Sequence, residues 1–414
     1  MKVSIITIGD EILIGQVIDS NSARIGQMIQ DLGLRVNFKW TISDERSEIL
    51  YTLSEAKTKS DIIFITGGLG PTNDDITKSI LAEFFQSNLV FSEKNYSHLE
   101  SLLKPRNIPI TESHKSQCFV PEIANLLDNQ MGTAMGLHIE QDQRIWFAMP
   151  GVPYEMEYIM KHQVLPLLQS KGLEKSSYYR TVHIMGQGET QIASVIEPLL
   201  QNKSQSIKIA YLPSLGYVRI RLTVDDNITS EIKKEVDQWI ELISEKFGTA
   251  VYGFDDTSLP KELSKLISDN NIQIGFAESC TGGYLSHLIT LIPGASQYFR
   301  GSIIAYSYEL KTQLCGVLPN TLVEYGAVSE PTVIEMAKGI AKRLDLDLAI
   351  SISGIAGPDG GTPEKPVGTV WIAVGNETDV KTKKLKLSKD RQRNIETSAY
   401  YAMILAWEWL KEHY

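Results

Sequence analysis

The chain has 414 residues, of which 43% are hydrophobic, and a formal net charge of −10 at neutral pH. This length exceeds what one hydrophobic core usually supports, so we expect roughly two or three domains. No stretch approaches the roughly 18 apolar residues of a membrane span. Direct nucleic-acid binding is not expected, because such domains are usually basic and we find no long lysine or arginine run. Three dispersed cysteines fit a reducing cytoplasm, where we expect the protein to reside.

The first part of the chain predicts strands that alternate with helices. Residues 3–8 and 62–65 are short apolar runs typical of buried strands, and residues 36–42 alternate between apolar and polar types. Apolar residues at helical spacing follow two of these strands: those at 25–32 follow the strand at 3–8, and those at 49–56 follow the strand at 36–42. This alternation predicts an α/β domain built on a doubly wound parallel sheet, which we place at 1–170.

The middle of the chain predicts a small α+β domain at 171–250. Tyr217–Val224 alternates strongly, as a half-buried strand does, and residues 232–247 are expected to form a helix. The segment 251–258 carries glycine, paired aspartates and serine, so we interpret it as a linker.

The last region, 259–414, predicts a second α/β domain with its own core. A helical stripe begins at Leu259, and another runs from Val333 to Leu344. The expected strands are 272–277, 302–306, 348–353 and 369–374.

A polar motif, Ala277–Gly283 (AESCTGG), joins a predicted strand to a predicted helix in this last domain. Ligands of open α/β sheets bind beyond the carboxyl ends of the strands, where a helix N-terminus offers free N–H groups. Ser279 is therefore a candidate nucleophile or phosphate contact. A capped helix preceded by a glycine turn explains the motif equally well.

Two further motifs follow in the same domain. Tyr306 ends a predicted strand, and Lys311 lies about one turn beyond it. A lysine that is buried beside a hydroxyl can lose its proton and act as a base. The alternative is an ordinary surface lysine. Residues 353–362 (SGIAGPDGGT) form a glycine-rich loop suited to hold an oxyanion or phosphate with backbone N–H groups, or an ordinary turn.

The N-terminal domain has one comparable motif, Thr66–Asp75 (TGGLGPTNDD), between a strand and a helix. Glycines permit close approach of the backbone to a phosphate or pterin. The motif is not a P-loop, because it lacks the lysine followed by serine or threonine. Asp74 and Asp75 suit a divalent metal bridged by phosphates, or serve only as charges at a helix start.

The motifs of the last domain closely resemble the C-terminal domain of the CinA family, known as nicotinamide mononucleotide deamidase (PncC). The matching blocks are AESCTGG, FRGSIIAYSYELK, GAVSE and SGIAGPDGGTPEKPVGTVWIA. The resemblance implies a Ser279 nucleophile, a Lys311 general base, Tyr306 in their proton network, and no metal or other cofactor. Cys280 is the rival nucleophile, because a thiol is intrinsically more reactive, but its side chain should point away from that of Ser279, so we interpret it as a packing residue. The implied substrate-binding residues are Glu278, Thr281, Gly282, Gly354, Gly357, Gly360, Gly361 and Thr362, with Arg391 or Arg393.

Residues 1–170 resemble the three-layer molybdopterin-binding fold of MoaB and MogA in its CinA version, through IGDEILIGQ, DSNS, GGLGPTNDD, MGTAMG and MPGVPYEM. GQGE at 186–189 resembles the KH-like domain of full-length CinA proteins. The resemblance implies, in some members, a metal-dependent ADP-ribose pyrophosphatase that uses Mg, Mn or Co, with Asp74 or Asp75 facing the metal. The implied pocket residues are Asp10, Glu11, Asn21, Gly67, Gly68, Gly70, Thr72, Gly132, Thr133, Pro150 and Gly151.

We therefore expect a cytoplasmic enzyme that acts on nicotinamide mononucleotide and ADP-ribose, and family likeness implies a homodimer. One alternative is an interaction protein of competence, since the family is linked to the recombinase RecA. Another is an N-terminal domain that binds a pterin or nucleotide without turnover.

Overall fold

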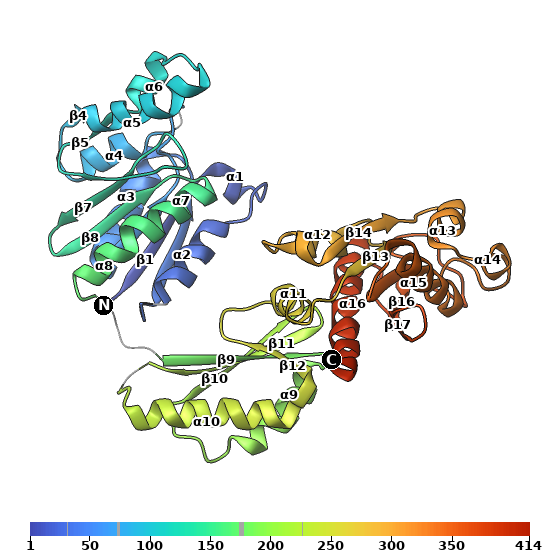
Figure 1. Ribbon diagram of the computed structural model, residues 1–414. Helices are drawn as coiled ribbons and strands as arrows, with labels where there is room; N and C mark the ends of the chain where they lie inside the picture. Colours follow the sequence, from blue (N-terminus) through green and yellow to red (C-terminus); the bar gives the residue numbers. More distant parts are fainter. Residues whose placement is uncertain (31, 73–74, 174–177, 226) are drawn as a thin grey trace. The chain divides into compact units, whose positions relative to one another are not determined.

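A computed structural model describes residues 1–30, 32–72, 75–173, 178–225 and 227–414. The chain divides into two compact units, Met1–Ser177 and Tyr178–Tyr414 (Figure 1). Within the residues described, we find no helix with the length and apolar character needed to cross a membrane.

The first unit is a three-layer α/β domain. Its six-stranded sheet has the order β2-β1-β3-β8-β7-β6, in which β2, β1, β3 and β8 run parallel, β7 runs antiparallel to β8, and β6 pairs antiparallel with β7. The parallel sheet that we predicted is therefore wrong at the β8–β7 and β7–β6 pairs, which are antiparallel. The elements are β1 (Val3–Ile8), α1 (Asp10–Leu13), α2 (Ser20–Gln30), β2 (Val36–Ile42), α3 (Arg46–Lys59), β3 (Ile62–Thr66), α4 (Thr77–Phe84), β4 (Leu89–Phe91), α5 (Glu93–Leu103), α6 (Glu112–Ser116), β5 (Phe119–Pro121), β6 (Asn125–Leu127), β7 (Gly136–Gln141), β8 (Arg144–Met149), α7 (Pro153–Ile159) and α8 (Leu165–Ser170).

Alternation of side chains along the strands explains the two cores of this unit. On one face, Ile6 and Ile63 pack with Leu53 of α3 and Leu81 of α4. The opposite faces of the same strands pack against α2 and α7. Every residue of β1 and β3 is buried, as expected for central strands covered by helices on both sides.

The second unit begins with the small α+β domain. Its antiparallel sheet has the order β10-β11-β9-β12, and α9 and α10 cover one face. The alternating burial of β11 confirms the strand predicted there. The elements are β9 (Tyr178–Met185), α9 (Glu189–Leu199), β10 (Lys208–Ser214), β11 (Tyr217–Val224), α10 (Ser230–Phe247) and β12 (Val251–Phe254).

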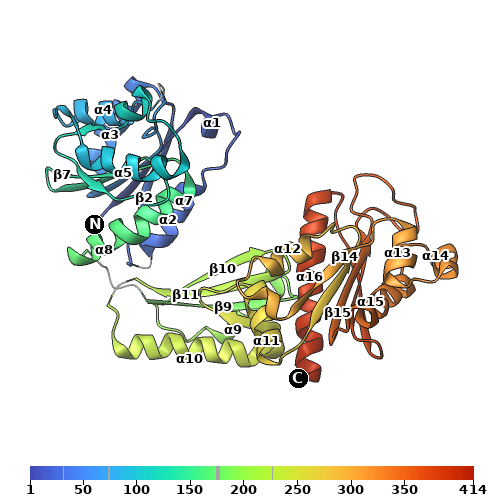
Figure 2. The same cartoon turned by 45° about the horizontal axis from the view of Figure 1, so that its top comes forward.

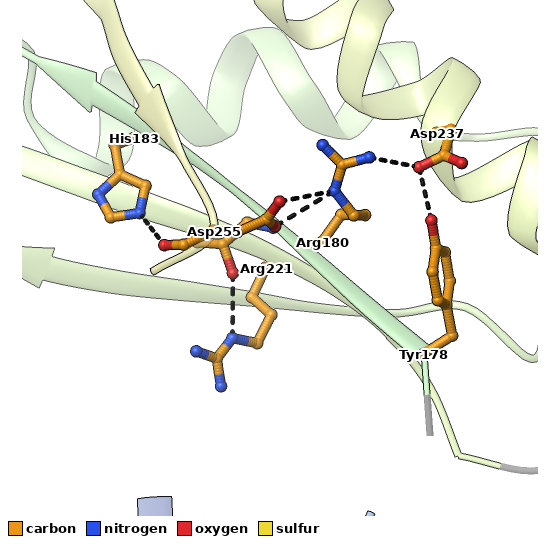
Figure 3. Close-up of polar contacts among 7 residues, drawn as sticks. Tyr178, Arg180, His183, Arg221, Asp237 and Asp255 are labelled. Carbon is orange, nitrogen blue, oxygen red and sulfur yellow. Dashed lines mark hydrogen bonds and ion pairs between the residues drawn. The ribbon is translucent and has the colours of Figure 1, made fainter. Parts of the chain in front are cut away.

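The predicted linker at 251–258 is wrong in its first half, because 251–254 is strand β12, paired with β9. Asp255 accepts hydrogen bonds from the backbone N–H of Thr181 at 2.9 Å and from Nε of Arg180 at 2.9 Å (Figure 3). The buried ring of His183 donates from Nε2 to the Asp255 carbonyl, at 2.8 Å. The paired aspartates had suggested a linker, but one of them, Asp255, holds this segment against the sheet.

The remainder of the second unit is built on a mixed five-stranded sheet in the order β14-β13-β15-β16-β17, in which β14, β13 and β15 run parallel, β16 runs antiparallel to β15, and β17 pairs antiparallel with β16. Helices α11, α12 and α16 pack on one face, and α13 and α15 on the other; Figure 2 shows α16 beside this sheet. The elements are α11 (Leu259–Asp269), β13 (Ile274–Glu278), α12 (Tyr284–Thr290), β14 (Phe299–Ile304), α13 (Tyr308–Cys315), α14 (Pro319–Tyr325), α15 (Glu330–Leu344), β15 (Leu348–Gly354), β16 (Thr369–Gly375), β17 (Val380–Lys386) and α16 (Arg391–His413).

This arrangement positions the polar motifs. The parallel strands β13, β14 and β15 end at the same edge of the sheet, so the loops that follow them meet there. These are the loops that carry Ser279, Tyr306 and the glycine-rich stretch after residue 353.

Candidate active site

The loop after β13 places Ser279 at the carboxyl edge of the sheet. The Ser279 N–H donates to the carbonyl of Ile352 in β15 at 3.0 Å, which fixes the loop against the neighbouring strand. Gly282 and Gly283 both have positive φ, 60° and 101°, a conformation that side chains with a Cβ rarely adopt. The two glycines therefore permit the turn from β13 into α12.

Glu278 has a different place from the one we predicted. Its side chain is fully buried, and its carboxylate accepts hydrogen bonds from the backbone N–H groups of Gly283, Leu285 and Ser286 at 3.0, 3.2 and 2.9 Å. It also accepts from the Ser286 hydroxyl at 2.6 Å. A carboxylate at the start of α12 satisfies N–H groups that the helix leaves without partners. Glu278 therefore holds the turn and does not line the cavity beside Ser279.

Ser279 and Lys311 meet, although they are 32 residues apart in sequence. The Nζ atom of Lys311 lies 2.9 Å from Oγ of Ser279 and donates to the carbonyl of Ala305 at 2.7 Å. Lys311 is only 1% exposed. Burial lowers the pKa of the Lys311 amine below its ordinary value, because a low-dielectric environment disfavours the charged form. A lysine held neutral beside a hydroxyl can accept that hydroxyl's proton.

Cys280 is the alternative nucleophile. Its side chain belongs to the hydrophobic core around β13, although the residue also contributes to the cavity wall. Burial raises the pKa of the Cys280 thiol to about 12, so the reactive thiolate is scarce at neutral pH. These observations favour the packing role that we expected.

Tyr306 and Arg391 complete the wall of the cavity. Tyr306 lies two residues beyond the end of β14 and is exposed. Its hydroxyl accepts from Nη2 of Arg391 at 3.1 Å, and Nη1 of Arg391 donates to the Gly357 carbonyl at 2.7 Å. The structure thus pairs the tyrosine hydroxyl with the arginine. Both arginines considered are exposed, but Arg391 lines the cavity and Arg393 does not.

The cavity around Ser279 has a volume of about 240 Å³ and includes only part of the predicted binding set. Gly354 and Gly357 line it, and the other predicted positions, Thr281, Gly282, Gly360, Gly361 and Thr362, do not. Backbone neighbours of the predicted glycines, Ile355 and Ala356, also line the cavity, and so do four further residues that were not predicted, Ser353, Ala327, Val328 and Asp359. All four lie in the sequence blocks GAVSE and SGIAGPDGGTPEKPVGTVWIA, and their place in these blocks was the signal that could have identified them.

A larger cavity, of about 390 Å³, lies in the first unit. Most of the predicted pocket residues line it, namely Glu11, Asn21, Gly67, Gly68, Gly70, Thr133, Pro150 and Gly151. Asp10, Thr72 and Gly132 do not line it. Three carboxylates that the sequence analysis did not single out, those of Asp19, Asp44 and Glu155, contribute to its wall. Among the described lining residues there is no lysine, arginine or histidine.

The predicted metal ligands can be examined only in part, because Asp74 lies outside the described residues. Asp75 lines the N-terminal cavity, and its Oδ2 accepts from the N–H of Thr72 at 2.9 Å and from the Thr72 hydroxyl. In the ranges that the structure covers, no three histidine, cysteine or acidic side chains gather as a metal site would require. Mg²⁺ is often held by one or two carboxylates together with substrate phosphates, and the acidic wall has the oxygen donors for that arrangement.

Three family models match the chain. They are described as "CinA C-terminal domain" over residues 256–410, "Probable molybdopterin binding domain" over 4–170, and "Damage-inducible protein CinA KH domain" over 179–253. A CinA-like protein of Cytophaga hutchinsonii is 40% identical, covering 99% of this chain and 98% of its own length. The chain belongs to the CinA family. A CinA-like protein of Flavobacterium psychrophilum is 36% identical over the full length of both chains.

Solved structures of CinA proteins are similar to part of the chain. The competence damage-inducible protein A of Klebsiella pneumoniae is 31% identical, covering 38% of this chain and 97% of its own, with a TM-score of 0.37. The protein CinA of Thermoplasma acidophilum, whose structure is described as of unknown function, is 29% identical, covering 41% and 96%, with a TM-score of 0.37.

Proposed function

We propose that the C-terminal domain is a serine–lysine amidase that converts nicotinamide mononucleotide and water to nicotinate mononucleotide and ammonia. The observation that carries the proposal is the 2.9 Å contact between Nζ of the buried Lys311 and Oγ of Ser279. The CinA C-terminal domain family is known as nicotinamide mononucleotide deamidase, which agrees with this chemistry.

The first half of the reaction forms an acyl-enzyme. Neutral Lys311 accepts the Ser279 hydroxyl proton as Oγ attacks the carboxamide carbon, and backbone N–H groups of the loop around Gly354 stabilise the oxyanion. The C–N bond then breaks, and the leaving nitrogen takes the proton from the Lys311 ammonium and departs as ammonia. This returns the lysine to the neutral form.

The second half hydrolyses the ester. Lys311 accepts a proton from water as the water oxygen attacks the acyl carbon. The bond from carbon to Ser279 Oγ breaks, Oγ regains a proton from Lys311, and the nicotinate nucleotide is released. Arg391, which lines the same cavity, is the cation placed to bind the substrate phosphate.

The direct test is ammonia release from nicotinamide mononucleotide by the full-length chain. We expect activity in the wild type and a loss of at least about a thousandfold in Ser279→Ala. Cys280→Ala is the matched control and should retain activity, because the thiol serves only packing in this proposal. Full activity in Ser279→Ala would refute the assignment, as would loss only in Cys280→Ala.

We propose a second, independent function for the first unit, a metal-dependent hydrolysis of ADP-ribose at its pyrophosphate. What favours it is a cavity of nucleotide size whose wall combines the glycine loop at 67–70 with several carboxylates. Glycine permits close approach of phosphates to the backbone, and a divalent metal would offset charge repulsion between phosphates and carboxylates.

The test compares ADP-ribose hydrolysis with and without Mg, Mn or Co. Asp75→Asn should reduce the metal-dependent rate, whereas Asp128→Asn, at a half-exposed residue paired with Lys94, should not. Binding of ADP-ribose without hydrolysis would instead support the nucleotide-binding alternative.

A further inference from the structure

Residues 381–393 form a strongly basic segment in an otherwise acidic chain. The segment contains one acidic residue, Asp390, whereas the whole chain has a net charge of −10. Because other residues separate the charges, no uninterrupted basic run reveals the segment in the sequence. The seven basic residues are Lys381, Lys383, Lys384, Lys386, Lys389, Arg391 and Arg393.

The structure separates the lysines of the segment into two groups. Strand β17 is the last strand of the sheet, next to β16, and α16 lies beside it (Figure 1). Lys381 pairs with Glu412 at 2.7 Å, and Nζ of Lys383 lies 5.3 Å from the centre of the Tyr401 ring, so both serve contacts with α16.

The second group consists of Lys384, Lys386 and Lys389, which are exposed. Within the described ranges, none of the three forms an ion pair with a carboxylate. Nζ of Lys384 lies 5.6 Å from the centre of the Trp371 ring, a contact that leaves its charge uncompensated. We call these three residues the lysine strip.

The lysine strip leads to the Ser279 cavity. Beyond β17, the N–H of Leu387 donates to the Gly368 carbonyl at 2.8 Å, which holds the chain against the end of the glycine-rich loop. A Cβ at Gly357, a cavity-lining residue, would lie 3.1 Å from the carbonyl oxygen of Lys389. Two residues later, the side chain of Arg391 enters the cavity wall.

We propose that the lysine strip is an electrostatic approach to the Ser279 cavity, which favours amide substrates that carry a phosphate over the same amides without one. The inference rests on the amidase proposed above and adds the source of its preference for phosphorylated substrates. Clustered charges of one sign raise the local concentration of an oppositely charged ligand. Added salt weakens this attraction, because the Debye length falls from roughly 10 Å at 0.1 M to 3 Å at 1 M.

The test uses the full-length triple variant K384Q/K386Q/K389Q. A matched control removes three exposed lysines elsewhere in the same unit, K234Q/K246Q/K265Q, and changes the net charge equally. Calorimetric binding and ammonia release are measured with nicotinamide mononucleotide and with nicotinamide riboside, at low and high salt. The riboside differs from the mononucleotide only in lacking the phosphate.

At low salt, we expect the triple variant to bind the mononucleotide about fivefold more weakly than the control, with KM raised by a similar factor. The difference should shrink in high salt, and riboside binding should not weaken. Equal mononucleotide binding by the triple variant and the control would overturn the inference, even if the amidase assay succeeds. Weaker mononucleotide binding by the triple variant alone supports the strip even if ammonia is not released, because binding does not require turnover.

Discussion

Among the residues that the structure describes, each unit buries one lysine amine, and the two lysines differ in what they contact. In the first unit, Nζ of Lys78 donates to the Gln117 carbonyl at 2.8 Å, and burial lowers the pKa of its amine to about 8. In the second unit, Lys311 contacts a carbonyl and also the Ser279 hydroxyl. Burial lowers the pKa of both amines, but of the two it is Lys311 whose amine lies at hydrogen-bond distance from a hydroxyl.

The comparison shows that a lowered lysine pKa does not by itself identify a catalytic base. Burial favours the neutral form of the amine in both places, and chemistry requires in addition a hydroxyl at hydrogen-bond distance and a cavity that admits the substrate. It also shows that the larger cavity is not the one with the clearest chemistry. The 390 Å³ cavity has acidic and glycine-rich walls, whereas the 240 Å³ cavity contains the serine–lysine pair.

The largest expected effect separates the two lysines by activity. Lys311→Met should lower kcat/KM for nicotinamide mononucleotide by about a hundredfold to ten-thousandfold, because it removes the general base. Lys78→Met is the matched control and should leave ammonia release unchanged. In the wild type, kcat/KM should rise with pH through the lowered pKa of Lys311, because only the neutral amine accepts a proton. A flat pH profile, or equal losses in the two variants, would remove the distinction between the lysines.

Glu278→Gln should have the next largest effect, on stability. The buried carboxylate accepts four hydrogen bonds at the start of α12, and an amide places an N–H group against one or more of these donors. We expect a loss of about 2 to 3 kcal/mol in the free energy of unfolding, measured with denaturant. Glu245→Gln, at an exposed position, is the control. If Glu278→Gln leaves the free energy of unfolding unchanged and raises KM for nicotinamide mononucleotide, Glu278 binds the substrate and does not stabilise the turn.

A third substitution compares two arginines that are two residues apart. Arg391→Gln should raise KM for the mononucleotide about tenfold or more, because a charged hydrogen bond to the phosphate is lost. Arg393→Gln should change KM little, since that side chain does not line the cavity. KM is measured for both variants by steady-state kinetics. An equal rise of KM in the two variants would contradict the proposal that Arg391 binds the phosphate.

The smallest expected effect returns to Lys78. The amine keeps its proton to a higher pH in the unfolded chain than in the folded one, where its pKa is about 8. The unfolded state therefore binds more protons between about pH 8 and 10, and stability rises with pH in that window. Lys78→Met should raise the free energy of unfolding by roughly 1 to 3 kcal/mol at pH 7 and by less at pH 10. A stabilisation that does not change with pH would show that the charge is not responsible.

Much of the fold was predictable because apolar patterning reports burial directly. The runs at Val3–Ile8 and Ile62–Thr66 are strands, and the alternation at Tyr217–Val224 is a half-buried strand. The linker prediction failed because local composition does not reveal a long-range contact such as that of Asp255 with Arg180. The antiparallel pairing of β7 with β8 and β6 was missed for a similar reason, since strand direction depends on tertiary pairing.

The candidate site was predictable only in part. The motifs located Ser279 and Lys311 but could not show which side chains point inward, so Glu278 was assigned to substrate and the Tyr306 hydroxyl to the serine–lysine pair. In the structure, the Glu278 side chain instead points toward the start of α12, and the Tyr306 hydroxyl accepts a hydrogen bond from Arg391. Side-chain direction at a loop depends on backbone turns such as the positive φ of Gly282 and Gly283, which residue spacing does not specify.

The most direct test of the serine–lysine mechanism is to identify the residue that becomes acylated during turnover. The full-length chain is mixed with excess nicotinamide mononucleotide, quenched with acid within the first turnover, digested, and analysed by peptide mass spectrometry. The mechanism predicts the acyl group on Ser279 in the wild type and no adduct in Ser279→Ala, which should also release no ammonia. An adduct on Cys280, or undiminished ammonia release by Ser279→Ala, would contradict it.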